Sequence, residues 1–419
     1  MSAETAAGFT RRDGQLMVES VPLAAVAETF GTPCYVYSRA CLEANWRACD
    51  AAFGARPHRI HYAVKANSNL AILGLLQRLG SGFDIVSGGE LARVLAAGAR
   101  GADIVFSGVG KTEGELAAAL EAEVACINVE SEPEMVRLSD LAHRLGKRAR
   151  IAFRVNPDVD PKTHPYISTG LEQNKFGVPM REAEALYTRA ARLPGLEIVG
   201  VACHIGSQMT DLAPLTDAIE RVVALAERLE SSGIPLKHLD LGGGLGIRYA
   251  EEEPPSFEAY VRTLCAIPER FEIHLEPGRA IVGNAGVLLT RVEYLKTTPT
   301  REFAVCDAAM TELIRPALYE AWHGVEPVAP AGAQARSARY DLVGPVCESA
   351  DFLAHGRDLT LTAGDVLALM NAGAYGFAMA SNYNTRPRPP EIIIDGTHMH
   401  VARARETVAK LMEGEKLLG

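Results

Sequence analysis

The sequence predicts an α/β protein, in which a (β/α)8 barrel is followed by a mostly antiparallel β domain. Eight short apolar or β-branched runs alternate with helix-like segments between residues 60 and 276. Each run ends in a polar or glycine-rich turn, which is typical of strands in βα units. After about residue 285 the helical segments largely disappear and apolar runs follow one another with turn signals between them. A run of eight strand-helix repeats therefore indicates a barrel.

The eight predicted strands share a short apolar core and a polar end. In chain order they are IHYAV, FDIV, DIVF, ACINV, RIAFRV, IVGVACHI, HLDL and EIHL. The segments between them, such as GELARVLAAGA and EGELAAALEAE, are rich in Ala, Leu and Glu at helical spacing. Residues of these types favour helices.

The second domain is predicted from the runs GVLLTRVEYL, FAVCDAAM, RYDLVG, DLTLTAGDVLALM and EIIIDG. The start of the chain carries Asp13-Gly14 between two β-prone runs, which is a hairpin signal. This hairpin is expected to join the β domain. We therefore predict a barrel over residues 33–284, and a β domain formed by residues 1–32 together with 285–419.

Composition excludes several classes of function. The chain has 419 residues, a formal net charge of -10 and no dense Lys/Arg tract, which argues against a nucleic-acid or anionic-membrane partner. No window approaches the 18 uninterrupted apolar residues of a membrane span, and residues 1–15 do not resemble a secretory signal. The sequence thus predicts a cytoplasmic protein that acts on small molecules.

The eight cysteines show no CxxC pair and no disulfide-like spacing. This usage favours reduced, mostly buried thiols over disulfides or zinc. No metal site is expected.

Polar residues follow the predicted strands at the face where barrel active sites lie. They are Lys65, Asp84, Asn128, Arg154, Asn156, His204, Ser207, the glycine run 242–246, and the EPGR turn 276–279. A lysine after a strand that looks buried is the most unusual of these, although a lone lysine is more often a snorkelling surface residue.

The glycine run and the EPGR turn are each ambiguous alone. Glycines after the seventh strand let backbone N–H groups approach a phosphate, but such a run more often marks only a tight turn. Glu276 and Arg279 in EPGR could form an ordinary ion pair. Together with Lys65, they match the needs of pyridoxal 5'-phosphate. Lys65 can form a Schiff base with the aldehyde, the glycine run can hold the phosphate, and Glu276 can keep the pyridine nitrogen protonated.

The motifs, taken in order, resemble a known family. HYAVKAN, HIGSQ, DLGGGLG, EPGRA, CES and GAYGFAMASNYN are similar to those of the alanine-racemase-fold, or fold type III, pyridoxal-phosphate decarboxylases. HPYISTG with KFGV, and MTELIRPALYEAWH, resemble the diaminopimelate decarboxylase branch of that family. The resemblance covers nearly the whole chain.

The resemblance implies roles at the cofactor. Lys65 would form the Schiff base, and His204 would stack on the ring. Ser207 and Gly244 would bind the phosphate, and Glu276 the pyridine nitrogen. The other residues expected to line the cofactor are Pro277, Gly278, Arg279 and Tyr375.

It also implies a substrate site. The residues expected there are Arg279, Arg315, Tyr319, Glu348 and Tyr375. The two arginines and Tyr319 would hold a distal carboxylate and Glu348 a distal ammonium. Cys347 would supply a proton, which makes Lys65, His204 and Cys347 the expected catalytic residues. Cys347 and Glu348 would reach the partner subunit's site in a homodimer.

The implied reaction is decarboxylation of meso-2,6-diaminopimelate to L-lysine and CO2, the last step of lysine biosynthesis. Arginine suits a carboxylate and glutamate an ammonium, which is consistent with a substrate that carries both at its distal end. Purely structural roles remain possible for these residues. Cys347 could be a buried thiol, Arg315 and Tyr319 could pack on the barrel rim, and Tyr375 could be a core aromatic. His164 and Tyr166 are expected in a lid.

Two other functions remain as alternatives. One is a related decarboxylase for another basic amino acid or polyamine precursor, which would leave arginines unmatched in the site. The other is a non-catalytic carrier of the same cofactor, which would not need the residues after the barrel.

Overall fold

The computed structural model describes residues 8–159 and 175–419, which form two compact units. The barrel unit comprises Asn45–Arg248 and Glu252–Ile281. The β unit comprises Met1–Ala44, Tyr249–Glu251 and Val282–Gly419. His164 and Tyr166, the residues expected in a lid, lie outside the described residues.

The barrel unit contains the predicted closed barrel of eight parallel strands. They are β5 (His58–Ala63), β6 (Gly82–Ile85), β7 (Ile104–Phe106), β8 (Cys126–Val129), β9 (Ala149–Asn156), β11 (Leu196–Cys203), β12 (His238–Asp240) and β13 (Glu272–Leu275). Pairing of β8 with β9 and of β13 with β5 closes the ring. A short strand, β10 (Val178–Pro179), adds to β9. Each of the eight sequence runs contributes one barrel strand, so the predicted fold is confirmed.

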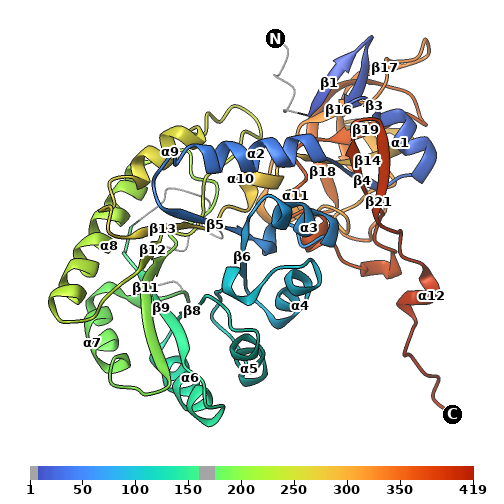
Figure 1. Cartoon of the computed structure of the whole chain (residues 1–419). Helices are drawn as coiled ribbons and strands as arrows, with labels where there is room; N and C mark the ends of the chain where they lie inside the picture. The colour runs from blue at the N-terminus through green and yellow to red at the C-terminus, as the bar shows by residue number, and fades with distance from the viewer. Residues whose placement is uncertain (1–7, 160–174) are drawn as a thin grey trace. The chain divides into compact units, whose positions relative to one another are not determined.

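Helices surround the strands of this unit (Figure 1). They are α3 (Leu70–Arg78), α4 (Gly88–Ala96), α5 (Glu113–Glu121), α6 (Glu132–Arg144), α7 (Met180–Ala190), α8 (Ala213–Ser231) and α9 (Phe257–Leu264). Polar side chains fix where several of them begin. Thr112 and Glu115 form a capping box at α5, and Ser87 and Ser131 cap α4 and α6. Because these caps lie just after the strands, they also fix the loops that carry polar residues.

The strand register brings residues from different motifs together. Ala63 on β5 pairs with Asp84 on β6, so the residues that follow β5 lie beside Asp84. Asp240 on β12 pairs with His274 on β13, two residues before Glu276. A cluster of buried residues from five strands packs within the barrel unit: Val105, Cys126, Ala152, Val199 and Ala202. The register and this packing together hold the polar groups at the strand ends in place.

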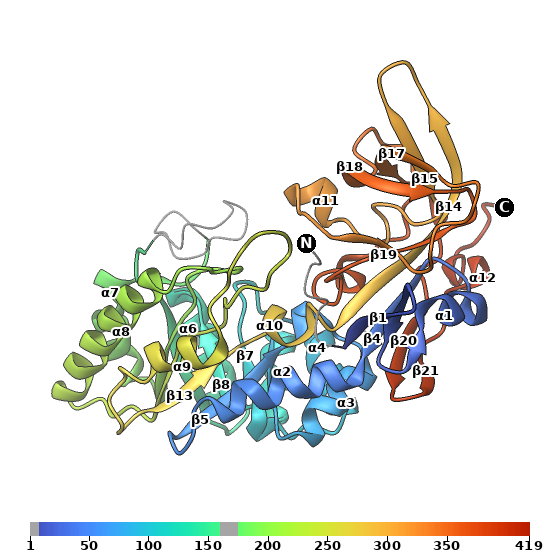
Figure 2. The same ribbon diagram turned by 90° about the horizontal axis from the view of Figure 1, so that it is seen from above.

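The β unit is built on a mixed sheet. Its strands are β4 (Cys34–Ser38), β14 (Gly286–Thr297), β15 (Glu302–Cys306), β16 (Val325–Pro327), β17 (Arg336–Val343), β18 (Phe352–Leu361), β19 (Val366–Leu369), β20 (Glu391–Asp395) and β21 (His398–Arg403). Figure 2 shows the long strand β14, which pairs with β4, β15 and β19. Most pairings are antiparallel; β15 with β17 and β4 with β20 are parallel.

The division between the units differs from the expected boundary at residue 33. Strand β4 pairs with β14 and β20, so this part of the chain lies in the β unit. Its five residues are all buried, as expected for a strand inside a sheet. The apolar run CYVYS alone could not distinguish a barrel strand from a central strand of the second sheet.

The N-terminal hairpin forms as predicted. Strands β1 (Phe9–Arg12) and β2 (Gln15–Val18) are antiparallel, and Asp13 and Gly14 both have positive φ at the turn. A third strand, β3 (Val21–Pro22), follows. Phe9, Leu16 and Val18 are completely buried in one apolar cluster with β-unit residues such as Val287 and Ile392. The hairpin is therefore part of the β unit.

The described residues form five further helices. They are α1 (Leu23–Phe30), α2 (Arg39–Ala51), α10 (Arg279–Val282), α11 (Arg315–Tyr319) and α12 (Val408–Leu411). Across residues 8–159 and 175–419, every helix is too short or too polar to cross a membrane.

Candidate active site

Lys65 lies in a short 3₁₀ turn, Val64–Ala66, directly after β5. Its Nζ is 2.7 Å from Asp84 Oδ2 on the neighbouring strand β6. The Asp84 side chain is 0% exposed, whereas that of Lys65 is 37% exposed. A buried carboxylate needs a partner, and the ammonium of Lys65 supplies it. The lysine is thus held at the barrel end with its amine partly accessible.

Asp240 and Glu276 form a pair of carboxyl groups at the same end of the barrel as Lys65. Burial raises the pKa of Glu276 well above its usual range, and the charges of Asp240 and Asp84 raise it further. Burial also raises the pKa of Asp240 to about 6, although its Oδ1 accepts the Gly242 N–H at 2.8 Å. Because burial and the neighbouring carboxyl charges act in the same direction on Glu276, a proton is favoured on this pair.

Polar side chains from two further strands approach Glu276. The Ser107 hydroxyl donates to Glu276 Oε1 at 3.5 Å, and Asn128 Nδ2 donates to Ser107 Oγ at 3.1 Å. All three side chains are buried. This chain of hydrogen bonds links the ends of β7 and β8 to the carboxyl pair and limits how Glu276 can turn.

Neighbouring atoms lie so close to the backbone of the glycine run after β12 that no side chain fits there. A Cβ at Gly243 would lie 2.2 Å from the carbonyl oxygen of Glu276, and one at Gly242 would lie 2.4 Å from His204 Nδ1. Gly244 has φ of 112°, where side chains are strained, and its Cβ would lie 2.5 Å from the carbonyl oxygen of Gly206. The backbone here is as close to its neighbours as glycine permits, which is a feature of loops that cradle an anion.

His204, the first residue after β11, contacts this run. The Gly243 N–H donates to His204 Nδ1 at 3.2 Å, so Nδ1 carries no proton. Burial lowers the pKa of His204 well below its usual value, and the charges of Arg154 and Lys65 lower it further. The imidazole is therefore neutral, which suits a flat ring that packs against another ring.

The loops after β11 and β12 are tied together. Met209 N donates to Gly244 O at 2.8 Å, and Gly246 N donates to Met209 O at 3.0 Å. The Gln208 side chain bonds both the N–H and the carbonyl of Ile247. The motifs HIGSQ and GGGLG, which are separate in sequence, thus form one structure.

The EPGR turn packs against the strand that carries Lys65. Ala63 N donates to Pro277 O at 3.1 Å, and a Cβ at Gly278 would lie 2.9 Å from the Ala66 Cβ. Arg279 Nη2 donates to Ser207 Oγ at 3.0 Å. The barrel unit therefore brings together Lys65, His204, Ser207, Gly244 and the EPGR turn at one end.

Lys111 is a buried lysine of the same unit, and all three of its N–H donors are used within the fold. Its side chain is 1% exposed. Its Nζ donates to Gly108 O, Asn128 O and Glu134 Oε1 at 2.7, 2.7 and 2.8 Å. An ammonium has three donors, so this one has no donor left for a ligand. Lys65 is the better candidate for covalent chemistry.

In the β unit, Arg315 begins helix α11 and is 7% exposed. Its Nη1 lies 2.9 Å from His323 Nε2, and its Cζ lies 4.6 Å from the centre of the Tyr249 ring. Tyr319 lies one turn further along the same helix. The motif MTELIRPALYEAWH thus holds a buried guanidinium between His323 and the Tyr249 ring.

Cys347 and Glu348 lie in a turn before β18. Cys347 is exposed, and its backbone N–H donates to Asn384 Oδ1 at 3.2 Å. Tyr383 donates its hydroxyl to Glu348 Oε1 at 2.7 Å. The CES motif is therefore bound to the end of the GAYGFAMASNYN motif.

Tyr375 has a positive φ of 56°, which is unusual for a bulky residue. Such conformations persist where the surrounding structure imposes them and are common at functional sites.

Six of the eight cysteines are buried, whereas Cys265 and Cys347 are exposed, so the alternative that Cys347 is only a buried core thiol is wrong.

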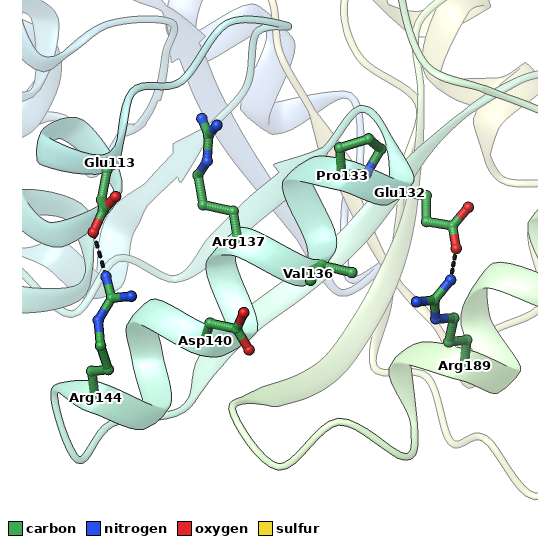
Figure 3. Close-up of a pocket in the computed structure, with 8 residues that line it drawn as sticks. All are labelled: Glu113, Glu132, Pro133, Val136, Arg137, Asp140, Arg144 and Arg189. Atoms are coloured by element: carbon green, nitrogen blue, oxygen red, sulfur yellow. Dashed lines mark hydrogen bonds and ion pairs between the residues drawn. The ribbon is translucent and has the colours of Figure 1, made fainter.

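A surface pocket in the barrel unit is lined by none of these residues. It has a volume of about 550 Å³ and lies on the outside of α5, α6 and α7 (Figure 3). Its lining residues are Glu113, Glu132, Pro133, Val136, Arg137, Asp140, Arg144 and Arg189. Ion pairs join Arg144 to Glu113 and Arg189 to Glu132. Its charges partly neutralise one another, and no nucleophile or buried titratable group lines it.

Several residues that contact predicted site residues within their own units could not be assigned from the sequence. Asp240, Ser107, His323 and Tyr383 each contact a predicted site residue. Each lies in or beside a motif: Asp240 stands before the glycine run, and His323 ends the MTELIRPALYEAWH segment. Their positions in or beside the motifs could have marked them as candidates, but only the structure shows which residues they contact.

Comparison with known proteins agrees with the geometry. Residues 39–283 match the family model of the pyridoxal-dependent decarboxylase, pyridoxal binding domain. The chain is 58% identical over 415 residues to a diaminopimelate decarboxylase of Pseudomonas aeruginosa, covering 98% of this chain and 99% of that protein. It is 55% identical over 411 residues to the enzyme of the same name from Vibrio cholerae, covering 97% and 98%.

A solved structure is similar over nearly its whole length. The diaminopimelate decarboxylase of Helicobacter pylori, complexed with L-lysine, superposes with a TM-score of 0.90 at 41% identity, covering 93% of this chain and 98% of that one. A match of this extent includes both the barrel and the β unit. The chain therefore belongs to the pyridoxal-dependent decarboxylases and, within them, to the diaminopimelate decarboxylase family.

Proposed function

We propose that the protein decarboxylates meso-2,6-diaminopimelate at its D-centre to give L-lysine and CO2, the last step of lysine biosynthesis. One structural observation carries the chemistry: Lys65, a glycine cradle and the buried Glu276 meet at one barrel end. The names of the full-length relatives support the choice of substrate.

The residues present fit pyridoxal 5'-phosphate. Lys65 would hold it covalently, and Ser207 with the backbone of Gly244 would bind its phosphate. His204 would lie against the ring, and Glu276 would face the pyridine nitrogen. The backbone of this run is held in place, because a Cβ at any position from Gly242 to Gly244 would collide with neighbouring atoms of the barrel unit. When bound, this cofactor supplies a conjugated ring that accepts the electron pair left as CO2 departs.

The carboxyl groups around the site have different tasks. Asp84 holds the Lys65 ammonium in place through its 2.7 Å contact. Glu276 would face the ring nitrogen and would favour its protonated form, in which the ring withdraws electrons best. Asp240 and Ser107 orient Glu276 from two sides. Burial raises the pKa of Glu276, so this carboxyl could carry the proton that the nitrogen would need.

Residues of the β unit would recognise the distal end of the substrate. Arg315, with Arg279 and Tyr319, would bind the distal carboxylate, since a planar guanidinium matches a carboxylate. Glu348 would bind the distal ammonium, and Tyr375 would touch both substrate and cofactor. Cys347 would return a proton to the carbon that lost CO2. Its exposure is consistent with a group that meets a ligand from outside its own unit.

We also propose a homodimer in which Cys347 and Glu348 complete the site of the partner subunit. The exposure of Cys347 and of Tyr383, which holds Glu348, supports this arrangement. A cytoplasmic location is proposed as well, because all eight cysteines are free, as is usual in a reducing compartment.

A direct test is CO2 release from a panel of meso-diaminopimelate, L-lysine, L-ornithine and L-arginine. We expect release from meso-diaminopimelate alone above trace level. The other three lack a distal carboxylate and would leave guanidinium groups unpaired, which lowers kcat/KM by about 10⁴-fold in sites built for such a group. Efficient release from ornithine or arginine would instead support the related decarboxylase.

A further inference from the structure

His323 makes two hydrogen bonds that together fix its protonation. Its Nδ1 lies 2.8 Å from the carbonyl oxygen of Met370, and its Nε2 lies 2.9 Å from Arg315 Nη1. A carbonyl only accepts, so Nδ1 must carry the proton. A guanidinium only donates, so Nε2 must be bare. Both bonds exist only in the neutral Nδ1–H form of the ring.

The ring is rigidly held. His323 is 0% exposed, and its carbonyl accepts a hydrogen bond from Arg357 Nη2 at 3.1 Å. Its ring meets the Tyr249 ring edge-on at 5.4 Å. The residue after it, Gly324, accepts the Met370 N–H at 2.8 Å. Side chain and backbone are therefore fixed by the same segment of the sheet.

This rigid ring orients the Arg315 guanidinium. His323 binds Nη1, and the Tyr249 ring lies 4.6 Å from Cζ. The bond uses one of the five N–H donors of the guanidinium. Fixing the plane of the group also fixes the direction of its Nε–Nη2 edge, and an edge of this kind can bind a carboxylate at two points. A lysine in place of Arg315 could not be oriented in this way.

We propose that His323 is a specificity-determining positioning residue, which acts through Arg315 to fix the affinity for a substrate with a distal carboxylate. The inference rests on the proposed function, because it needs Arg315 to bind that carboxylate. It adds a residue outside the predicted site, and it states which atom is needed: an acceptor at the position of Nε2. The acceptor, rather than the bulk of the ring, is the property to test.

Two variants separate the two ring nitrogens. Asparagine at 323 places an amide near Nδ1, so His323→Asn can keep the bond to Met370 O but has no acceptor for Arg315. Glutamine places its amide oxygen near Nε2, so His323→Gln keeps that acceptor.

The two ligands to compare are meso-diaminopimelate and D-lysine. D-lysine has the same reacting end but lacks the distal carboxylate. The readouts are KM and kcat for the first and the inhibition constant for the second.

We expect His323→Asn to raise KM for meso-diaminopimelate about tenfold or more, since a hydrogen bond to a charged group is lost. Its inhibition constant for D-lysine should change less than about twofold, and His323→Gln should restore most of the KM. Equal losses for both ligands, equal losses in both variants, or an unchanged KM in His323→Asn would each overturn the inference.

Two controls keep the outcome clear. If Arg315→Ala raises KM and His323→Asn does not, the inference fails and the proposed function stands; if Arg315→Ala leaves KM unchanged, the proposed role of Arg315 fails. ¹⁵N-histidine NMR of the unmodified protein gives a test that needs no variant to fold well. It should show a buried neutral ring protonated at Nδ1, and a doubly protonated or Nε2–H ring at 323 would contradict the proposal.

Discussion

Lys65 Nζ and Asp84 Oδ2 lie 2.7 Å apart at the ends of two neighbouring barrel strands, with the carboxylate fully buried and the amine partly exposed. The contact follows from the register, in which Ala63 pairs with Asp84. It places a reactive amine at the mouth of an apolar barrel, where an unpaired ammonium would be unfavourable.

Replacing Asp84 should reveal this coupling. In the cofactor-free protein, Asp84→Asn should lower the free energy of unfolding by about 1 to 2 kcal/mol, less than for a fully buried pair because Lys65 is 37% exposed. Urea unfolding measures the change. In a Lys65→Met background the same substitution should have a much smaller effect. Equal destabilisation in both backgrounds would show that the two residues are not coupled.

Covalent trapping should identify one lysine. Borohydride treatment of the loaded protein should attach the cofactor to Lys65, because Lys111 uses all three of its donors within the fold. Peptide mass spectrometry locates the adduct, and Lys65→Ala provides the unlabelled control. An adduct on Lys111 or Lys175 would require another active-site assignment.

Glu276→Gln should change the pH dependence of stability. The ordinary pKa of this carboxyl is 4.5, and burial raises it well above that value in the folded protein. Between those two pKa values the folded state holds a proton that the unfolded state lacks, so stability falls as pH rises through this window. In the cofactor-free protein, the variant should therefore gain thermal stability relative to the unmodified protein as pH increases from about 5 to about 8.

The same variant should bind the cofactor, as judged by visible absorbance, yet lose kcat by on the order of 100-fold, because it removes the charge opposite the ring nitrogen. Asp240→Asn serves as the matched control for stability, and it should show the same sign of pH effect because the pKa of Asp240 is raised to about 6. Parallel stability curves for Glu276→Gln and the unmodified protein would contradict the raised pKa.

Mixing two inactive variants should test the shared sites. Lys65→Ala and Cys347→Ala, allowed to exchange chains, should recover about a quarter of the unmodified activity, since about half the dimers are mixed and each holds one intact site. Each variant incubated alone is the control. Proven chain exchange without recovery would place both residues in the site of one chain.

The barrel could be predicted from the sequence because every βα unit repeats the same local pattern. The eight runs and the Asp13-Gly14 hairpin are predicted by local sequence patterns, and the structure forms these elements. Strand β4 could not be placed, because CYVYS is apolar throughout and its partners β14 and β20 are more than 240 residues away.

The site could be predicted in part. Lys65, Glu276 and the glycine run stand at strand ends, where chemistry is expected in a barrel. The roles of Asp240 and His323 could not be predicted, since they depend on which atoms face Glu276 and Arg315. Sequence spacing does not determine such contacts across strands.

The proposed function requires this chain to remove the carboxylate at the D-centre of meso-diaminopimelate. The most direct measurement is a single turnover with substrate carrying ¹³C in that carboxyl group, followed by mass analysis of the released gas and the amino-acid product. We predict ¹³CO2 and unlabelled L-lysine. Label retained in the amino-acid product, or no release of gas by protein that has its cofactor bound, would contradict the proposed function.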